Sequence, residues 1–395
     1  MSTDESRAGL RFFLVSIVVS LSLLGDSLLY AVLPARPEDF QVLVWQVGVL
    51  LGANRLMRLI TNELAGRIVH RSRSLKPLLL AVIFGSLSTA SYTLSWGFWG
   101  LLAARMVWGA CFSVLRVEGD LSVLDISTAR NRGRTFALYN VIVRGISGGG
   151  VLLGGFLCDL VGVGQTFLLY CVISAAGIPL VLKSPRRASE STVSQESEAP
   201  RLSIQKSHVL LWTCALGISL ADAMVTNLTG RIVADRIMPG FPYIVGAASL
   251  TGLLLSVRSI GSLIINPLAG AFGDRFERSK FLLVLVFLQI GVIAILAVTT
   301  QWLVTIMVII VHFMIAESAR LVLYAMAGDH AISEARAIYM NRFATFTDLG
   351  LAVGPILSFG LYSGIGFAAV AAVAVAILLL VLVFLRALHR SERIR

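Results

Sequence analysis

The chain carries an internal repeat, because residues of its first half recur at one fixed spacing in its second half. Each match lies 204 positions downstream, which is about half of the 395-residue length. The matched pairs are Arg116 and Arg320, Asp125 and Asp329, Arg132 and Arg336, Leu64–Gly66 and Leu268–Gly270, and Gly150-Val151 and Gly354-Pro355. Matches in one register indicate an internal duplication. In a hydrophobic protein, a repeat of this size is typical of transporters, whose homologous halves enclose a site near the middle of the membrane.

The composition places the chain in a membrane. Hydrophobic residues make up 57% and charged residues 14%, and the mean hydropathy is +0.85, values that exclude a soluble enzyme. Apolar stretches of about 20 residues, enough to cross a bilayer as helices, are predicted twelve times, six in each half: 11–33, 43–65, 77–95, 98–122, 135–158, 164–182, 208–230, 245–268, 281–299, 302–325, 341–362 and 364–386. We expect the first stretch to begin a span rather than a cleavable signal, since no small-residue cleavage pattern precedes the second span.

The positions of lysine and arginine predict the orientation in the membrane. Every second loop and both tails are basic, whereas the alternate loops hold only Arg36, Arg231 and Arg236. By the positive-inside rule both termini are cytoplasmic, and the net charge of +11 needs no nucleic acid to explain it. Residues 183–207 have the composition of a linker, rich in Ser, Glu and Arg. We therefore expect an N-terminal bundle over 1–182, a cytoplasmic linker over 183–207 and a C-terminal bundle over 208–395.

Several short motifs resemble those of the major facilitator superfamily. The loop signature G-x-x-x-D-R is present in full at Gly270–Arg275, and a degraded copy at Gly66–Arg71 has His70 in place of the aspartate. Arg105–Gly109 fits the helix 4 pattern R-x-x-x-G, and Gly150–Gly155 fits the antiporter-associated helix 5 pattern without its proline. The resemblance covers essentially the whole chain. It implies an all-α integral membrane protein with twelve transmembrane helices in two pseudo-symmetric six-helix bundles.

The loop motifs predict a gate at the cytoplasmic ends of the helices. In the second half Asp274 can pair with neighbouring arginines and hold these ends together. His70 removes one permanent negative charge from the first copy, so that gate is either weaker or pH-dependent, because histidine titrates near neutrality. We favour the weaker gate. The residues that we assign to the cytoplasmic gate are Gly66, His70, Arg71, Arg116, Asp125, Gly270, Asp274, Arg275, Arg320 and Asp329.

Ionisable residues inside the spans are the candidates for coupling to protons, since a charge in the hydrocarbon layer is costly and faces a cavity or a partner. We assign this role to Asp26, Asp222, Glu317 and Asp348. Asp26 and Asp222 lie mid-span in the first helix of each half, which lines the central cavity in the superfamily. An unpaired carboxylate there is suited to carry a proton. Two pairs of opposite charge lie one helical turn apart: Glu317 with Arg320, and Arg116 with Asp120. We prefer the interpretation that these residues neutralise each other and serve the structure.

Arginines inside the spans are the candidates for binding substrate: Arg55, Arg58, Arg105, Arg144 and Arg258. Arg55 and Arg58 share one helix face, where two guanidinium groups can hold a carboxylate or phosphate. Alternatively Asp26 or Asp222 meets an arginine from another helix, with Arg55, Arg58 and Arg144 as candidates. Arg144 also aligns with Asp348 at the 204-residue spacing, so these opposite charges can pair in one conformation and separate in another.

Three functions fit the sequence. The first is proton-coupled export of a small organic molecule, a drug or a metabolite, by alternating access. The second is a carrier of organic anions, and the third is a membrane sensor that does not transport. We favour the first, in a monomeric plasma-membrane protein, with a bacterial inner membrane as the expected location. Its partners are then a small-molecule substrate, protons and the lipid bilayer. We expect no nucleic acid partner, cofactor, metal or enzymatic activity, since no nucleophile-base pair or metal-ligand cluster is present.

Overall fold

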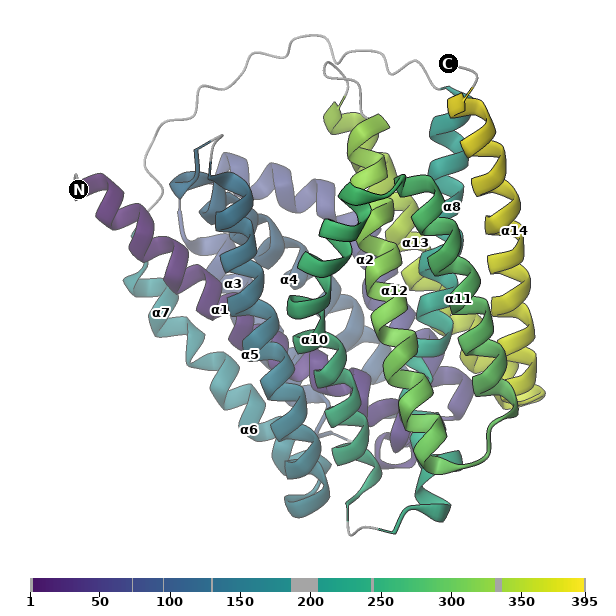
Figure 1. The fold of residues 1–395 in the computed structure, drawn as a ribbon. Coiled ribbons are helices and arrows are strands. Elements are labelled where there is room, and N and C mark those ends of the chain that lie inside the picture. Colours follow the sequence, from purple (N-terminus) through teal and green to yellow (C-terminus); the bar gives the residue numbers. More distant parts are fainter. Residues whose placement is uncertain are drawn as a thin grey trace. The chain divides into compact units, whose positions relative to one another are not determined.

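The computed structural model describes residues 3–72, 74–94, 96–128, 131–185, 205–242, 245–330 and 336–393. Over these ranges the secondary structure is helical, with no strand (Figure 1). The helices are α1 (Thr3–Ala35), α2 (Val44–Arg71), α3 (Lys76–Ser91), α4 (Gly97–Ile126), α5 (Arg132–Val161), α6 (Val163–Ala175), α7 (Gly177–Lys183), α8 (Lys206–Asn227), α9 (Thr229–Ile232), α10 (Ala247–Arg275), α11 (Arg278–Val298), α12 (Trp302–His330), α13 (Arg336–Gly364) and α14 (Phe367–Arg393), with short turns η1 (Pro37–Phe40), η2 (Val233–Ile237) and η3 (Met238–Gly240).

These elements form the twelve rods that the hydrophobic pattern predicts. Helices α6 and α7 make one rod over Val163–Lys183, and α8 continues through α9 and the two short turns to Gly240. Ten rods among the described residues are long and apolar enough to cross a membrane. The others are α2, which carries several charged residues along its length, and α3, which has only 16 residues.

Close contacts group the chain into two compact units. Unit 1 contains Met1–Gln46, Ala53–Glu190 and Pro242–Ile260. Within it, α1 packs against α4, α5 and α6, and α3 packs against α4 and α6. A core of buried side chains joins α1, α3 and α4: Val15, Val18, Val19, Leu78, Ala81, Val82, Trp108, Cys111 and Leu115, with Val181 of α7. The apolar residues of α1 therefore face protein rather than lipid over much of its length.

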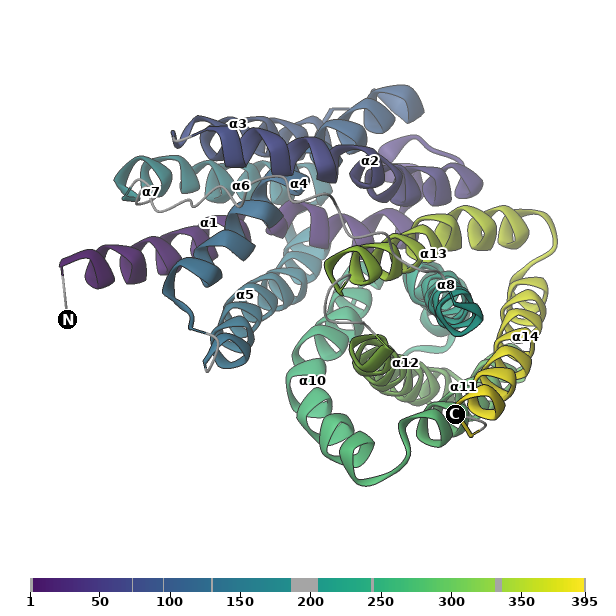
Figure 2. The same cartoon turned by 90° about the horizontal axis from the view of Figure 1, so that it is seen from above.

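Unit 2 contains Val47–Gly52, Ser191–Phe241 and Gly261–Arg395. Helix α8 lies among α12, α13 and α14, as the view of Figure 2 shows. Arg236 contacts the end of α11 and the start of α14. Its guanidinium donates to the carbonyls of Leu296 and Ala297 at 2.9 and 3.3 Å. These carbonyls end α11, where a helix has orphan acceptors and a negative dipole end. The same guanidinium lies 5.3 Å from the ring centre of Phe367, at the start of α14.

Two helix crossings reproduce the internal repeat. In unit 1, a Cβ on Gly252 of α10 would lie 2.7 Å from the carbonyl oxygen of Val151 on α5. In unit 2, a Cβ on Gly48 of α2 would clash with the carbonyl oxygen of Pro355 on α13. Both members of the second contact differ by 204 positions from their counterparts in the first. Only glycine allows such an approach of two backbones, so the repeat extends from the sequence to the packing.

A second contact at each crossing is also related to its counterpart by the spacing of 204 residues. Ser256 of α10 donates its hydroxyl to the carbonyl of Gly148 on α5 at 2.7 Å. The residue equivalent to Ser256 is Gly52 of α2, and the residue equivalent to Gly148 is Ala352 of α13. A Cβ added to Gly52 would lie 2.5 Å from the carbonyl oxygen of Ala352. In the family-like motif on α5, by contrast, Gly150 and Gly154 face the leucines of α1 and Tyr170 of α6. That part of the glycine run packs the first half internally.

The predicted spans locate the helices but not their ends. Helix α1 begins at Thr3 rather than near residue 11, and Arg11, which the sequence assigned to a basic tail, is 5% exposed. Its guanidinium forms an ion pair with Glu118 of α4 at 2.6 Å. Of the predicted linker, residues 186–204 lie outside the described ranges.

Candidate functional site

The first buried polar site is centred on Asp26 of α1. Its carboxylate forms an ion pair with Arg105 of α4 and accepts a hydrogen bond from the side-chain amide of Asn54 on α2, with 3.1 Å between Nδ2 and Oδ1. The Arg105 side chain is 1% exposed and that of Asp26 is 12% exposed. A buried ion pair of this kind is held by its hydrogen bonds and is costly to break from one side.

The sequence around Arg105 explains why three helices meet there. Gly109 lies one turn further along α4, and a Cβ at this position would be 2.6 Å from the backbone oxygen of Asn54. The missing side chain therefore lets α2 approach α4 closely enough for Asn54 to reach Asp26. This gives a physical reason for the R-x-x-x-G spacing, since arginine and glycine one turn apart lie on the same helix face.

Aromatic rings support the arginines of this site. The Tyr30 ring lies one turn beyond Asp26 on α1, with the guanidinium carbons of Arg105 and Arg55 at 5.3 and 5.9 Å from its centre. Arg58 lies 4.6 Å from the ring centre of Phe112 on α4. Such stacking stabilises guanidinium groups away from bulk water by cation–π attraction. The site thus brings together Arg55, Arg105 and Asp26 from the predicted set.

The second buried polar site contains Asp222 of α8. Its Oδ1 accepts a hydrogen bond from the hydroxyl of Thr226, one turn along the same helix, at 2.8 Å. Nε2 of His312, on α12, lies 3.7 Å from the same oxygen. The side chains of Asp222 and His312 are 6% and 0% exposed. Two side chains that can each carry a proton therefore lie close together, at a distance longer than a hydrogen bond.

The other predicted residues are distributed over several helices. Glu317 pairs with Arg320 on α12, as the i,i+3 spacing predicts. Asp348 lies on α13, Arg144 on α5 and Arg258 on α10, all partly buried. Their assigned roles, and the pairing of Arg144 with Asp348, stay predictions. Asp26 does meet an arginine from another helix, but it is Arg105 and not one of the three candidate partners.

Several residues of the predicted cytoplasmic gate lie near helix ends. His70 and Arg71 are exposed in the last turn of α2, and Arg275 is exposed at the end of α10. Asp329, near the end of α12, pairs with Arg278 at the start of α11 at 2.6 Å. The side chain of Asp274 lies outside the described part of the chain. The gate therefore stays a prediction.

Sequence reasoning missed His312, Asn54 and Tyr30. His312 carried a usable signal, because it is a titratable side chain in the middle of a predicted span. Asn54 directly precedes Arg55, but no local pattern shows that its amide faces Asp26, 28 positions away. Tyr30 lies at i+4 from Asp26, which places it on the same helix face.

Comparison with known proteins adds the family. The family model described as Major Facilitator Superfamily matches residues 15–235 and 223–394. A Danio rerio protein named probable vesicular acetylcholine transporter-B is 28% identical over 184 residues, which are 42% of this chain and 37% of that protein. An uncharacterized MFS-type transporter of Yersinia enterocolitica is 28% identical over 156 residues, 39% of this chain and 38% of that protein. These alignments span well under half of either relative.

Solved structures share the fold at low sequence identity. A bacterial homologue of the human lysosomal transporter Spinster, in an inward-facing and occupied conformation, has a TM-score of 0.74 at 14% identity, over 96% of each chain. The nucleoside transporter NupG has a TM-score of 0.78 at 13% identity, over 96% of this chain and 99% of that one. At such identities the likeness concerns the fold alone. With the family model matched along nearly the whole sequence, the chain belongs to the major facilitator superfamily of membrane transporters.

Proposed function

We propose that this protein is a secondary transporter that exports a small organic molecule in exchange for protons, with Asp222 and His312 as the central proton-carrying groups. The observation that carries the proposal is their proximity, 3.7 Å, at positions with almost no exposure. Burying two titratable groups within spanning helices costs free energy, so such groups mark a functional site by default. The first half has a buried ion pair of its own, between Arg105 and Asp26.

The two sites suggest a division of roles. In the Asp26 site a permanent cation neutralises the carboxylate, and a guanidinium does not lose its proton at any physiological pH. In the Asp222 site the neighbouring group is an imidazole, a side chain that can take up and release a proton. Protonation of the Asp222 and His312 pair can therefore alternate with substrate binding, whereas the Asp26 site changes by exchanging partners. The predicted roles of Glu317 and Asp348 in coupling belong to the same proposal.

The proposed substrate class follows from one relative and from the charges of the two sites. The zebrafish relative is named for acetylcholine, a small organic cation, and a buried carboxylate is a suitable partner for such a charge. A second candidate, a carrier of organic anions, is favoured by the three arginines Arg55, Arg58 and Arg105 beside aromatic rings. Guanidinium groups backed by rings would bind a carboxylate or a phosphate.

A proteoliposome assay tests the proposal. The purified protein is reconstituted into liposomes with a pH-sensitive dye inside, and an outward or inward proton gradient is imposed. Radiolabelled organic cations and organic anions are screened separately, so that proton movement and substrate movement are both measured. We expect cations to cause proton movement opposite to their own, and none in empty liposomes. Proton-independent movement of anions would replace the proposal by the second candidate. No movement of either class, in liposomes whose protein is folded, would contradict both.

Orientation is the next prediction. Arg134 is exposed in the basic first turn of α5, and Glu38 is exposed in η1 between α1 and α2. In a background without the native cysteines, Arg134→Cys should react with an impermeant maleimide only in inverted vesicles. Glu38→Cys should react in intact cells. The opposite labelling would reverse the topology given by the positive-inside rule.

A further inference from the structure

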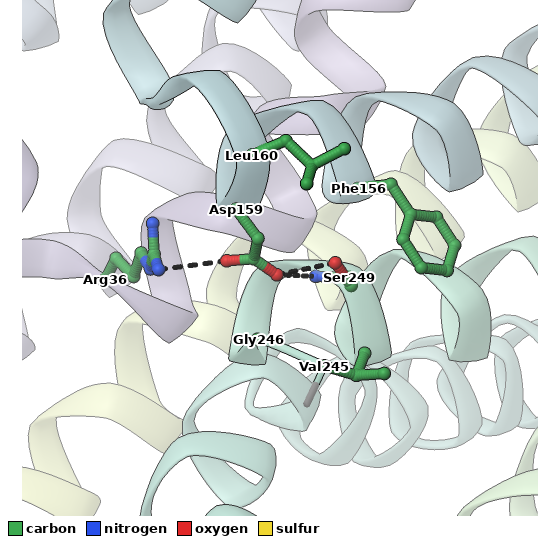
Figure 3. Close-up of a pocket in the computed structure, with 7 residues that line it drawn as sticks. All are labelled: Arg36, Phe156, Asp159, Leu160, Val245, Gly246 and Ser249. Carbon is green, nitrogen blue, oxygen red and sulfur yellow. Dashed lines mark hydrogen bonds and ion pairs between the residues drawn. The ribbon is translucent and has the colours of Figure 1, made fainter. Parts of the chain in front are cut away.

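A carboxylate at the end of α5 caps a helix of the other sequence repeat. Asp159 lies in the last turn of α5, and Ser249 lies in the first turn of α10. Oδ2 of Asp159 accepts hydrogen bonds from the backbone N–H of Ser249 at 2.7 Å and from its hydroxyl at 2.6 Å. Nη2 of Arg36, just after α1, lies 2.9 Å from Oδ1 (Figure 3). We call Arg36, Asp159 and Ser249 the end latch.

Asp159 occupies the place of a missing capping side chain. The residue before α10 is Gly246, and a Cβ there would overlap the carboxylate of Asp159. A capping residue at this position normally uses its own side-chain oxygen to accept from the backbone N–H of the second or third helical residue. Ser249 is that third residue. The absence of a side chain at Gly246 thus leaves the α10 N-terminus dependent on a cap from α5.

The charge of Asp159 is stabilised by α10 and not by its own helix. At the C-terminal turn of its own helix a carboxylate opposes the helix dipole, but at the N-terminus of α10 it is favoured. Arg36 supplies a second favourable partner. Asp159 loses its attraction to the α10 N-terminus if α5 and α10 separate at this end, whereas Arg36 follows α1, which packs against α5.

The end latch lies beside a pocket that lets water reach it. The pocket has a volume of about 430 Å³, and Phe156, Leu160 and Val245 line it together with the end-latch residues. The Arg36 side chain is 31% exposed. When the contacts break, the charged groups can be hydrated, which lowers the cost of release compared with a fully buried pair. Such a contact is suited to form and break repeatedly.

The equivalent crossing of α2 and α13 is built differently. Ser363 stands at the position that corresponds to Asp159, and its hydroxyl donates to the carbonyl of Gly360 in its own helix at 3.0 Å. At the start of α2 the side chain of Gln46 accepts from the backbone N–H of Leu43 at 2.8 Å. Both ends are therefore satisfied locally. The charged contact exists at the α5 and α10 crossing without a counterpart at these equivalent positions.

We propose that the end latch holds α5 against α10 at the end opposite the basic loops and sets how readily this side of the carrier opens. The glycine crossing next to it supplies close packing, and the end latch supplies the charge-assisted hydrogen bonds that must break first. The inference is independent of the substrate and of the coupling ion, because it concerns the separation of two helices.

Distance measurements on the full chain in nanodiscs test it. Nitroxide labels at Leu153 and Leu253, which are 63% and 41% exposed, report the separation of α5 and α10 in a background without native cysteines. Gly246→Ser gives α10 its own cap and displaces Asp159, and Asp159→Leu removes the acceptor. Each should raise the ratio of long to short distances by about tenfold or more, as expected for lost hydrogen bonds to a charged group.

The control variant is Asp39→Asn. Asp39 lies 3.8 Å from the Arg36 guanidinium, so the variant removes a neighbouring carboxylate and leaves the α10 cap in place. We expect its distance distribution to match that of the parent. Gly246→Ser should also keep the parent's thermal stability, because the helix remains capped. An unchanged distribution in Gly246→Ser or in Asp159→Leu, or an equal shift in Asp39→Asn, would overturn the proposal.

Discussion

Replacing Asp222 by asparagine is expected to abolish transport driven by a proton gradient, down to the level of empty liposomes. Asparagine has the same shape as a protonated aspartate and can still accept the hydrogen bond from Thr226, which is 2.8 Å long in the parent. It cannot gain or lose a proton. Exchange of the substrate across the membrane at equal pH should remain measurable, since substrate-for-substrate exchange moves no proton and does not need Asp222 to change its protonation state.

Two further variants sharpen this result. His312→Gln should give the same phenotype if the imidazole and the carboxylate act as one pair, because interacting titratable groups bind and release protons jointly. Glu38→Gln makes the same chemical change at an exposed acid and should transport like the parent. Gradient-driven transport at parent rates in Asp222→Asn would remove this residue from the coupling mechanism.

Replacing Arg105 by leucine is expected to cause the largest loss of stability. The change leaves the Asp26 carboxylate buried with the amide of Asn54 as its described remaining donor. Removing one partner of a buried ion pair costs about 3 to 5 kcal/mol. Thermal unfolding in detergent, followed by tryptophan fluorescence, should show a much lower midpoint. The double variant with Asp26→Asn should recover a large part of the loss, since no unpaired charge is left.

An exposed ion pair provides the comparison. Arg67 and Glu63 lie at i,i+4 on α2 with side chains 67% and 76% exposed. Arg67→Leu should change the free energy of unfolding by no more than about 0.5 kcal/mol, because surface pairs contribute little. The double-mutant cycle then isolates the coupling between Arg105 and Asp26. A loss in Arg105→Leu as small as that in Arg67→Leu would show that the pair does not stabilise the fold.

The fold was largely predictable, because hydrophobic length and an internal repeat are properties of the sequence itself. Twelve rods follow the twelve apolar stretches, although α3 ends at Ser91, short of the predicted 95. The structure adds that the same spacing of 204 residues relates Gly48 to Gly252, and their backbone partners to each other. The division into bundles at 183–207 stays a proposal.

The candidate sites were less predictable, because their partners are distant in sequence. Asp26 and Arg105 are 79 positions apart, and Asp159 and Ser249 are 90 apart. No periodicity relates such residues. Arg11 is a further case, since nothing near it in the sequence predicts that its guanidinium pairs with Glu118, 107 positions away. The pair of Glu317 and Arg320 was predictable because helical spacing alone brings them together.

The two glycine crossings have a consequence for the free energy with which the helices associate. At Gly48 and Gly252 the touching surfaces are backbone, with few side-chain torsions to arrange. Ordering a long side chain costs up to about 2 kcal/mol of rotamer entropy, whereas glycine has none to lose. Helices that meet through glycine can therefore re-form their contact at a lower entropy cost than helices that meet through long side chains. A contact between two backbones is thus specific in its position and loses little side-chain entropy when it forms.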